Sequence, residues 1–397
     1  MAREIKNKNI GDKIEQLLSD KPTGTVLVDE AAMTVWIAGP SPDTSVNVFA
    51  NPATNFPQVT LTGTYTGSLD LQFVQCTDSR YSSGYTVVAS AGAIPSGVTS
   101  LTIANTVADN TGFTYYTTGS TPCSISFPDA EYSIGGMNFS GAITALDLPK
   151  LITISGDCYL YSVNMSNILS FPRLISIDGG FYPEYSTIPA MSFPVLATIN
   201  GSFNPYQIDG ITSMSFPVLT TISDTQGING GNFSPQNLPS LTSMSFPVLA
   251  TINGGNFSPQ NLPSLTSMSF PALTTIGGDF DITDGWSLQS ADFPALETVG
   301  GHIQDNTNSN AMDSFTMFNI GTHLKSVGGN VFFTHSALDQ TSVDNLLVAL
   351  ANLNGTNGTS RYENHTVTIT GTSSAPSATG LAAKTTLQNR GCTVTTN

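Results

Sequence analysis

The residues best suited to chemistry are acidic side chains and a histidine near the end of a repetitive region. Asp279 and Asp281 stand two positions apart, so on a strand they share one face, and His302 aligns with Asp279 one repeat later. Neighbouring strands lie about 4.8 Å apart, which would bring two carboxylates and an imidazole together. Glycoside hydrolysis uses such a carboxylate pair, one as acid and one as nucleophile or base.

Two other interpretations fit the same residues. With Asp284 the segment reads Asp-x-Asp-x-x-Asp-Gly, which approaches a calcium loop but misses the EF-hand register by one residue. The equivalent outward positions of other repeats are polar too, which favours an ordinary solvated ladder: Asp157, Ser202, Asn232, Asn256 and Asn330. We therefore predict no catalytic residue and no metal, and keep Asp279, Asp281 and His302 as candidate ligand-binding residues.

Aromatic residues at predicted turns are further recognition candidates. Tyr182 and Tyr185 fall in one turn, Tyr206 in the next repeat, and Trp286 in a later one. Aromatic rings stack on sugar faces and make low-entropy contacts with protein partners. A local packing role is the alternative for each ring taken alone.

No motif for nucleophilic catalysis, metal binding or a cofactor occurs. The four histidines have no HExxH or other ligand spacing, and GxSxG, Walker and GxGxxG motifs are lacking. Cys76, Cys123, Cys158 and Cys392 are too far apart for a CxxC motif, so we expect buried free thiols. These observations predict a protein that is not an enzyme and needs no cofactor.

Charge excludes two classes of partner. The 397 residues carry 12 Lys and Arg against 28 Asp and Glu, a formal net charge of −16. Such a chain repels phosphate backbones and anionic lipid headgroups, so we expect no nucleic-acid partner. Since no stretch of about 18 apolar residues occurs, we also expect no membrane insertion.

An internal repeat is the strongest signal in the sequence. Its element is Phe-Pro-x-Leu-x-x-Ile, and successive copies start about 23 residues apart at Phe171, Phe193, Phe216, Phe246, Phe270 and Phe293. Residues 228–247 and 252–271 are identical, which indicates a duplicated unit. Because each coil of a solenoid contacts only its neighbours, a copied coil is tolerated there. The repeat therefore predicts a solenoid.

Apolar positions within the repeat predict two short strands per coil. Met and Phe alternate with Ser before each Pro, so that stretch has one inward face, and the Pro lies at its end. A second strand follows the Gly-Gly turn, where Phe280, Ile303 and Val331 would point inward. Cys158 occupies the corresponding position in an earlier coil, so we expect its thiol in the core.

The spacing Leu-x-x-Met-x-Phe-Pro-x-Leu-x-x-Ile-x-Gly-Gly resembles the leucine-rich-repeat group, in its receptor L-domain and bacterial surface-repeat variants. The resemblance implies a right-handed parallel β-solenoid. It departs from the usual pattern by lacking the consensus Asn and by placing Phe-Pro at the strand end. We accordingly expect a mainly β fold with a solenoid of about 23-residue coils over residues 94–339.

The two ends of the chain differ from the repeat. Residues 1–21 are charge-rich, and Ile10, Ile14, Leu17 and Leu18 form one apolar stripe of a short helix, which we interpret as a docking segment for assembly. Residues 22–93 contain short β-type runs and predict a small β domain. Residues 340–397 predict two helices and two strands, an α/β cap similar to the tail of many phage and bacterial repeat proteins.

Composition and the N-terminal residues together suggest where the protein acts. The first residues lack the apolar core of a signal peptide, yet the body is rich in Ser, Thr, Asn and Gly and nearly lacks Lys, as in displayed proteins. A virion protein made in the host cytoplasm reconciles these features. We expect a phage head or tail fibre or capsid decoration protein, a homo-oligomer whose N-terminus contacts capsid or tail proteins. Its solenoid would bind a bacterial surface glycan or protein. A cell-surface adhesin and a tailspike-like glycan hydrolase are the alternatives.

Overall fold

The structure is a computed structural model. It describes residues 122–128, 136–224, 231–282, 287–305 and 314–397, and elsewhere only the backbone of nine short strands. The predicted docking helix with Ile10, Ile14, Leu17 and Leu18 lies outside the described residues, as do Asp284 and Trp286. The chain divides into two compact units, residues 1–156 with 160–167, and residues 157–159 with 168–397.

The first unit combines one antiparallel sheet with parallel ladders. Four strands form the antiparallel sheet: β1 (Val26–Asp29), β2 (Thr34–Ile37), β3 (Ser45–Asn51) and β4 (Phe56–Thr62). The parallel strands are β5 (Gly67–Gln72), β6 (Ala91–Ile94), β7 (Val98–Ala104), β8 (Phe113–Thr117), β9 (Cys123–Ser126), β10 (Tyr132–Ser133), β11 (Met137–Ser140), β12 (Ile143–Asp147) and β13 (Thr153–Ile154). Strand β5 lies before residue 94, where the predicted solenoid range begins, and pairs in parallel with β7.

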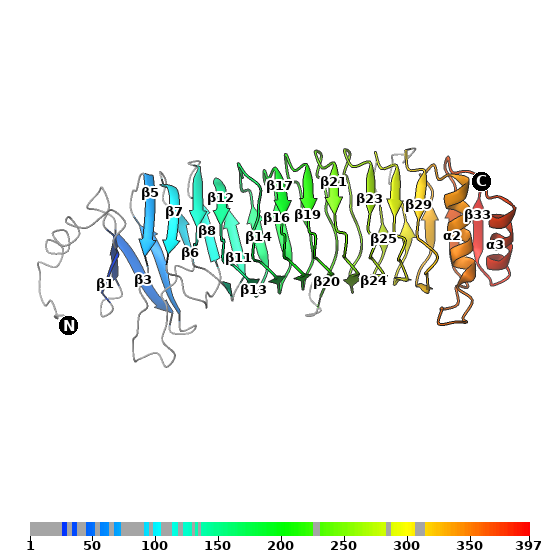
Figure 1. Cartoon of the computed structure of the whole chain (residues 1–397), viewed down its shortest axis with the longest axis horizontal. Coiled ribbons are helices and arrows are strands. Elements are labelled where there is room, and N and C mark those ends of the chain that lie inside the picture. Colours follow the sequence, from blue (N-terminus) through cyan, green and yellow to red (C-terminus); the bar gives the residue numbers. More distant parts are fainter. Residues whose placement is uncertain are drawn as a thin grey trace, which may run out of the picture. The chain divides into compact units, whose positions relative to one another are not determined.

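The second unit is a parallel β-solenoid of about 23-residue coils, as the repeat predicted. Each coil contributes strands at up to three positions, and the strands at one position lie side by side along the coils in Figure 1. The first sheet position holds β17 (Ala190–Ser192), β19 (Ser213–Ser215), β21 (Ser243–Ser245), β23 (Ser267–Ser269), β26 (Ser290–Asp292) and β29 (Met317–Asn319). The second holds β15 (Ser176–Ile177), β18 (Thr198–Ile199), β20 (Thr221–Ser223), β22 (Thr251–Asn253), β24 (Thr275–Ile276), β27 (Thr298–Val299) and β30 (Ser326–Val327).

The third sheet carries the candidate site. It contains β14 (Cys158–Tyr161), β16 (Phe181–Glu184), β25 (Phe280–Asp281), β28 (Ile303–Gln304), β31 (Val331–Phe333), β32 (Thr366–Ile369) and β33 (Thr393–Thr396). Between β16 and β25 the ladder continues as single parallel bridges that join Phe181, Phe203, Phe233, Phe257 and Phe280 in turn. Each outward residue therefore has an aligned neighbour one coil away.

Two interlocked columns of phenylalanine fill the core of these coils. Rings of the Phe-Pro column, from Phe193 to Phe293, stack at centroid distances of 5.1 to 5.7 Å. Rings of the third-sheet column, from Phe181 to Phe280, stack at 5.1 to 5.9 Å. Each ring meets the other column edge to face, as for Phe257 and Phe270 at 5.0 Å and 89°. Both arrangements are favoured by the ring quadrupole, so one Phe-rich coil templates the next.

The predicted inward residues of the third sheet are confirmed. Cys158, Phe280, Ile303 and Val331 are fully buried. Burial and the neighbouring charge of Asp157 disfavour the thiolate and raise the pKa of Cys158 far above its ordinary value. The thiol is accordingly an inert core group.

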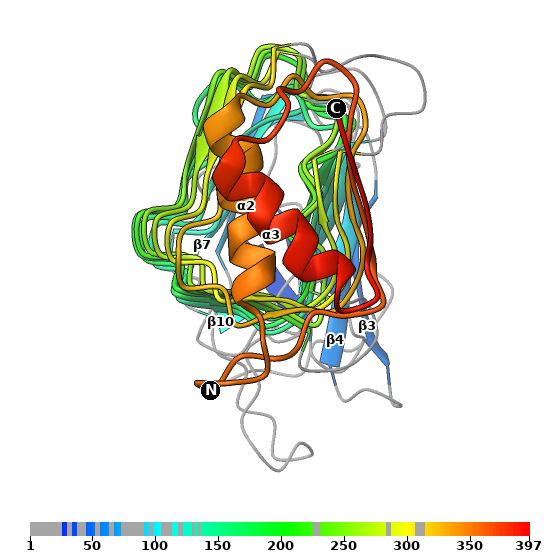
Figure 2. The same ribbon diagram turned by 90° about the vertical axis from the view of Figure 1, so that its right-hand side faces the viewer.

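The C-terminal cap contains the two helices and two strands predicted for residues 340–397. Helices α2 (Gln340–Asn352) and α3 (Ala378–Gln388) cross the end of the coils in Figure 2. Asp339 caps α2 by accepting from the Ser342 N–H at 2.7 Å. Arg390 donates to the carbonyls of Ala351 and Leu353, each at 2.8 Å, and so caps the carboxyl end of α2.

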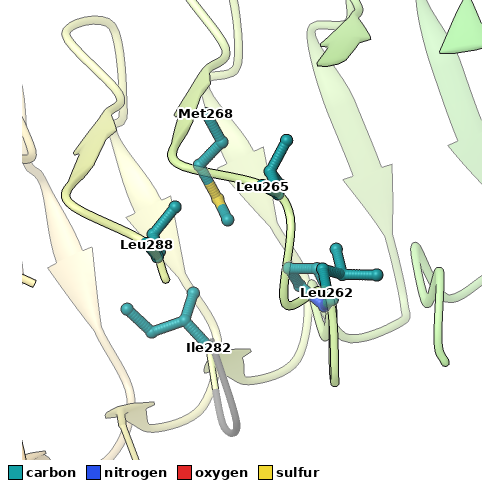
Figure 3. Close-up of a pocket in the computed structure, with 6 residues that line it drawn as sticks. Leu262, Leu265, Met268, Ile282 and Leu288 are labelled. Atoms are coloured by element: carbon teal, nitrogen blue, oxygen red, sulfur yellow. The ribbon is translucent and has the colours of Figure 1, made fainter. Parts of the chain in front are cut away.

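One small apolar cavity interrupts the core near the end of the duplicated region. Leu262, Leu265, Met268, Ile282 and Leu288, with Pro259, surround about 10 Å³ (Figure 3). The parallel register sets Ala291 beside Met268, whereas earlier coils pair methionine with methionine at this position. A cavity this small and apolar stays dry, so it is a packing defect and not a ligand site.

Candidate functional site

The acidic residues singled out by the sequence belong to a regular ladder of hydrogen bonds. Asp279 Oδ1 accepts from the backbone N–H of His302 at 2.7 Å, and His302 Nδ1 accepts from the N–H of Asn330 at 2.8 Å. Asn256 Oδ1 in turn accepts from the N–H of Asp279 at 2.8 Å. Each of these side chains therefore caps a backbone N–H of the next coil.

The same contact recurs along the second unit, and we call the set the cap ladder. Its members are Asp157, Ser202, Asn232, Asn256, Asp279, His302 and Asn330. An unpaired N–H in a tight turn costs free energy, so a side-chain acceptor in this position stabilises coil stacking. The ladder interpretation of these positions thus has a specific structural basis.

Both carboxylates of the candidate pair accept hydrogen bonds from the next coil. Asp279 Oδ1 is committed to a backbone N–H, and Asp281 Oδ2 accepts from the Gln304 amide at 3.1 Å. His302 lies on the ladder with Nδ1 as acceptor, so its Nε2 carries the proton.

Within the described ranges, no group of three or more His, Cys, Asp or Glu side chains could hold a metal ion. Nor is any helix in those ranges long and apolar enough to cross a bilayer.

Tyr182 completes the cap ladder at the one coil turn where a glycine replaces the capping side chain. Gly180 occupies the ladder position between Asp157 and Ser202, and a Cβ added there would overlap the outer end of the Tyr182 ring. The Tyr182 hydroxyl instead hydrogen-bonds the backbone and side chain of Ser202. The ring is therefore held in a fixed orientation over Gly180.

A second tyrosine, which sequence analysis did not single out, stacks on this ring. Tyr159 aligns with Tyr182 one coil earlier, and their centroids are 4.8 Å apart with planes 16° from parallel. The Tyr159 hydroxyl donates to Asp157 Oδ2 at 3.1 Å. Since the separation equals one coil spacing, the other face of Tyr182 is turned toward the coil of Ser202 and Asn204.

These tyrosines border an open groove of about 440 Å³ on the outer side of the third sheet. We call it the tyrosine groove, and its lining residues are Tyr159, Tyr182, Glu184, Ser202, Asn204, Asn232, Ser234 and Gln236. The bridge register places Tyr182, Asn204 and Ser234 in one row along the solenoid. Large rings followed by small polar side chains create the hollow.

One polar atom of the groove lacks a partner. Asn204 Oδ1 is covered from solvent and, within the part of the chain that the structure describes, accepts no hydrogen bond. By contrast, Gln236 donates to Ser234 Oγ at 2.6 Å. Buried acceptors are normally satisfied, so this oxygen beside the groove has an unmet need for a donor.

Tyr185 and Tyr206 form a second aromatic pair beside the groove. Their centroids are 5.4 Å apart and their planes 75° from parallel. Glu184 of the groove is bridged to Tyr206, which is bridged to Gln236. Three of the predicted aromatic candidates thus lie together on one stretch of the third sheet, away from the coils of Asp279, Asp281 and His302.

The electrostatic character of the groove is negative. Burial raises the pKa of Glu184. Burial and the charge of Asp157 raise the pKa of Tyr159 to about 12, and the same two causes raise that of Tyr182. No residue lining the groove is basic. The tyrosines therefore remain neutral hydrogen-bonding rings in an acidic surrounding.

Aligning the coils on the third sheet rather than on Phe-Pro would have revealed more of this site. Cys158 and Phe181 occupy equivalent inward positions, so Tyr159 and Tyr182 must be neighbours. Asn204 and Gln236 carried no sequence signal, because polar residues are common at outward positions of every coil.

Comparison with known proteins leaves this site unassigned. No family model matches the sequence, and no curated protein matches it. Among solved structures, the crystal structure of the pneumococcal vaccine antigen PcpA aligns with 95% of this chain and all of its own, at 9% identity and a TM-score of 0.22. A likeness at this level supports no conclusion about function.

Proposed function

We propose that this protein is a non-enzymatic attachment protein displayed on a surface, whose solenoid presents the tyrosine groove to a bacterial cell. The observation that carries the proposal is the groove itself, with ordered aromatic rings, polar floor residues and an unpartnered acceptor on a repetitive scaffold. Rigid aromatic rings next to adaptable polar groups are typical of recognition surfaces.

A bacteriophage virion is the carrier we propose, as head or tail fibre or capsid decoration, and a bacterial cell surface is the second candidate. The low content of Lys and the abundance of Ser, Thr, Asn and Gly support display in either setting. A homo-oligomer anchored by its N-terminal segment would give many weak sites collective avidity.

Mass spectrometry of density-banded virus particles and of washed cell envelopes tests the carrier. Hundreds of copies per particle would indicate capsid decoration, and a few to a few dozen a fibre. Presence on envelopes alone would favour the adhesin.

A binding assay tests attachment itself. Fluorescently labelled full-length protein should adhere to bacterial cells, and a variant with Tyr182 and Tyr159 both changed to alanine should not. Equal adherence of both proteins would contradict the proposal.

A further inference from the structure

We propose that the tyrosine groove binds a neutral glycan that lies along the solenoid axis, with Tyr182 against a sugar face and Asn204 accepting a hydrogen bond from a sugar hydroxyl. The inference deepens the proposed function and rests on it, because it names the class of ligand.

The tyrosine groove is several coils long. The groove residues belong to four successive coils, from Tyr159 through Tyr182 and Asn204 to Gln236. At about 4.8 Å per coil this length is about 14 Å. The hollow is therefore elongated along the axis, which suits a short oligosaccharide segment better than a single small molecule or a bulky protein loop.

The Tyr182 ring is a preorganised surface for a sugar. Tyr182 is fixed by its bonds to Ser202 and by stacking on Tyr159, so little conformational entropy remains to be lost on binding. The C–H-rich face of a pyranose packs on such a ring. Its hydroxyls project sideways, toward the hydroxyl and amide groups of the floor.

The floor of the groove has an acceptor that needs a hydrogen-bond donor. The floor offers hydroxyl and amide groups, and Asn204 Oδ1 has no donor among the residues described. The terminal torsion of asparagine is broad, so the amide can turn its oxygen toward a donor in the groove. A sugar hydroxyl supplies such a donor, which removes the cost of the orphan acceptor.

Carboxylates in and near the groove determine which sugars it can accept. Glu184 lines the groove, Asp157 bonds the Tyr159 hydroxyl, and the charge of Asp224 acts on Tyr182. Three carboxylates without a lining cation repel uronates, sialic acids and phosphates. Neutral sugars escape this penalty, and their hydroxyls can donate to the carboxylates.

The test uses the full-length chain and a panel of soluble probes. Neutral linear oligomers of glucose, mannose and N-acetylglucosamine are compared with oligomers of galacturonate and sialic acid by isothermal titration calorimetry. We expect at least one neutral oligomer to bind, and every acidic oligomer to bind at least tenfold more weakly. Tighter binding of an acidic oligomer would overturn the inference.

A matched pair of variants separates ligand binding by the Tyr182 ring from the capping hydrogen bond of its hydroxyl. Gly180→Asn with Tyr182→Ala restores an amide cap on the ladder but removes the ring, and should lose about tenfold or more in affinity for the neutral oligomer. Tyr182→Phe removes the cap but keeps the ring, and should bind within a few-fold of the parent. The reverse order would overturn the role of the ring.

Asn204→Leu provides a readout that a purely structural residue would not give. Removing the orphan oxygen should raise the melting temperature while affinity for the neutral oligomer falls about tenfold. Val218→Ala, on an exposed ridge outside the groove, is the control and should change neither value. A lower melting temperature with unchanged affinity would refute the assignment of Asn204.

Chemical treatment of cells distinguishes failure of the inference from failure of the proposed function. Periodate, which cleaves vicinal diols of sugars, should abolish adherence, and protease treatment should not. Adherence that survives periodate but not protease would replace the glycan with a protein ligand and leave attachment intact. No adherence to untreated cells would refute attachment itself.

Discussion

Glu184 illustrates how burial of one carboxylate shapes both stability and binding. Its pKa is raised above the ordinary value of 4.5 because the groove desolvates it. A raised carboxyl pKa means that folding favours the protonated form. The associated stabilisation is complete below pH 4.5 and is lost as the pH rises through the folded-state pKa.

Glu184→Gln, which mimics the protonated form, should therefore stabilise the protein at pH 7 and not at about pH 3. Since the side chain is partly exposed, we expect only a few tenths of a kcal/mol. Urea unfolding at the two pH values measures the difference. A variant less stable than the parent at pH 7 would mean that the carboxylate is stabilised by contacts and not strained by burial.

Tyr185 adopts a backbone conformation that is unfavourable for an aromatic residue. Its φ of 51° lies in the left-handed region, and the equivalent corners of later coils hold Gln207, Asn237 and Asn261 at 48° to 54°. Asparagine tolerates this conformation far better than an aromatic residue. Tyrosine at this corner therefore costs more than asparagine would, while the corner itself recurs from coil to coil.

At the scale of the element, the glycine turns set how closely coils can stack. A Cβ on Gly300 would overlap the backbone carbonyl oxygen of Gly277 in the previous coil, whereas the atoms nearest a Cβ on Gly180 belong to the outer end of the Tyr182 ring. Gly300→Ala should therefore destabilise the solenoid by roughly 1–3 kcal/mol. Gly180→Ala, the matched control, should cost less because displacing one side chain, with its bonds to Ser202, costs less than displacing the backbone. Thermal unfolding compares them, and equal costs would show that the turn adjusts freely.

The cavity of Figure 3 leads to a prediction about how core packing stabilises this coil. Met268 is 6% exposed and borders a gap that its loss would enlarge. Met268→Ala should cost roughly 2–4 kcal/mol, because the transfer and cavity terms add. Met317→Ala, at an equivalent strand but 59% exposed, should cost under about 1 kcal/mol. Chemical denaturation checks both variants, and a small loss for Met268 would mean that the coils collapse into the gap.

The elements were largely predictable from sequence, and the site was not. Helices α2 and α3 lie within residues 340–397 as expected, since periodicity and caps are local signals. The inward Phe280 and Ile303 followed from a period of two. The stacking of Tyr159 on Tyr182, by contrast, depends on which residues face each other across coils, and the capping role of Asp279 depends on a backbone N–H that no side-chain pattern reveals.

For the second unit as a whole, repetition governs stability. The Phe columns, the cap ladder and the sheets all connect each coil to the next, at sequence offsets of 22 to 30 residues. Folding free energy is then close to a sum over coils and their interfaces. Local variation such as Gly180 with Tyr182 is tolerated because its effects extend little beyond adjacent coils. A recognition site can thus differ from the repeat without loss of the scaffold.

Deletion of residues 248–271 tests this additivity, because it removes one complete 24-residue copy and joins Pro247 to Ala272 in the repeat register. Phe233 would then face Phe280 in place of Phe257, so both ring columns and the ladder of Asn232 re-form. We expect cooperative unfolding and unchanged groove affinity, with stability lowered by about one coil's contribution. Deleting only residues 248–259 breaks the register, and that variant should fail to fold. Circular dichroism and calorimetry compare the two. Equal disruption by both deletions would show that the coils depend on long-range contacts and not on their neighbours alone.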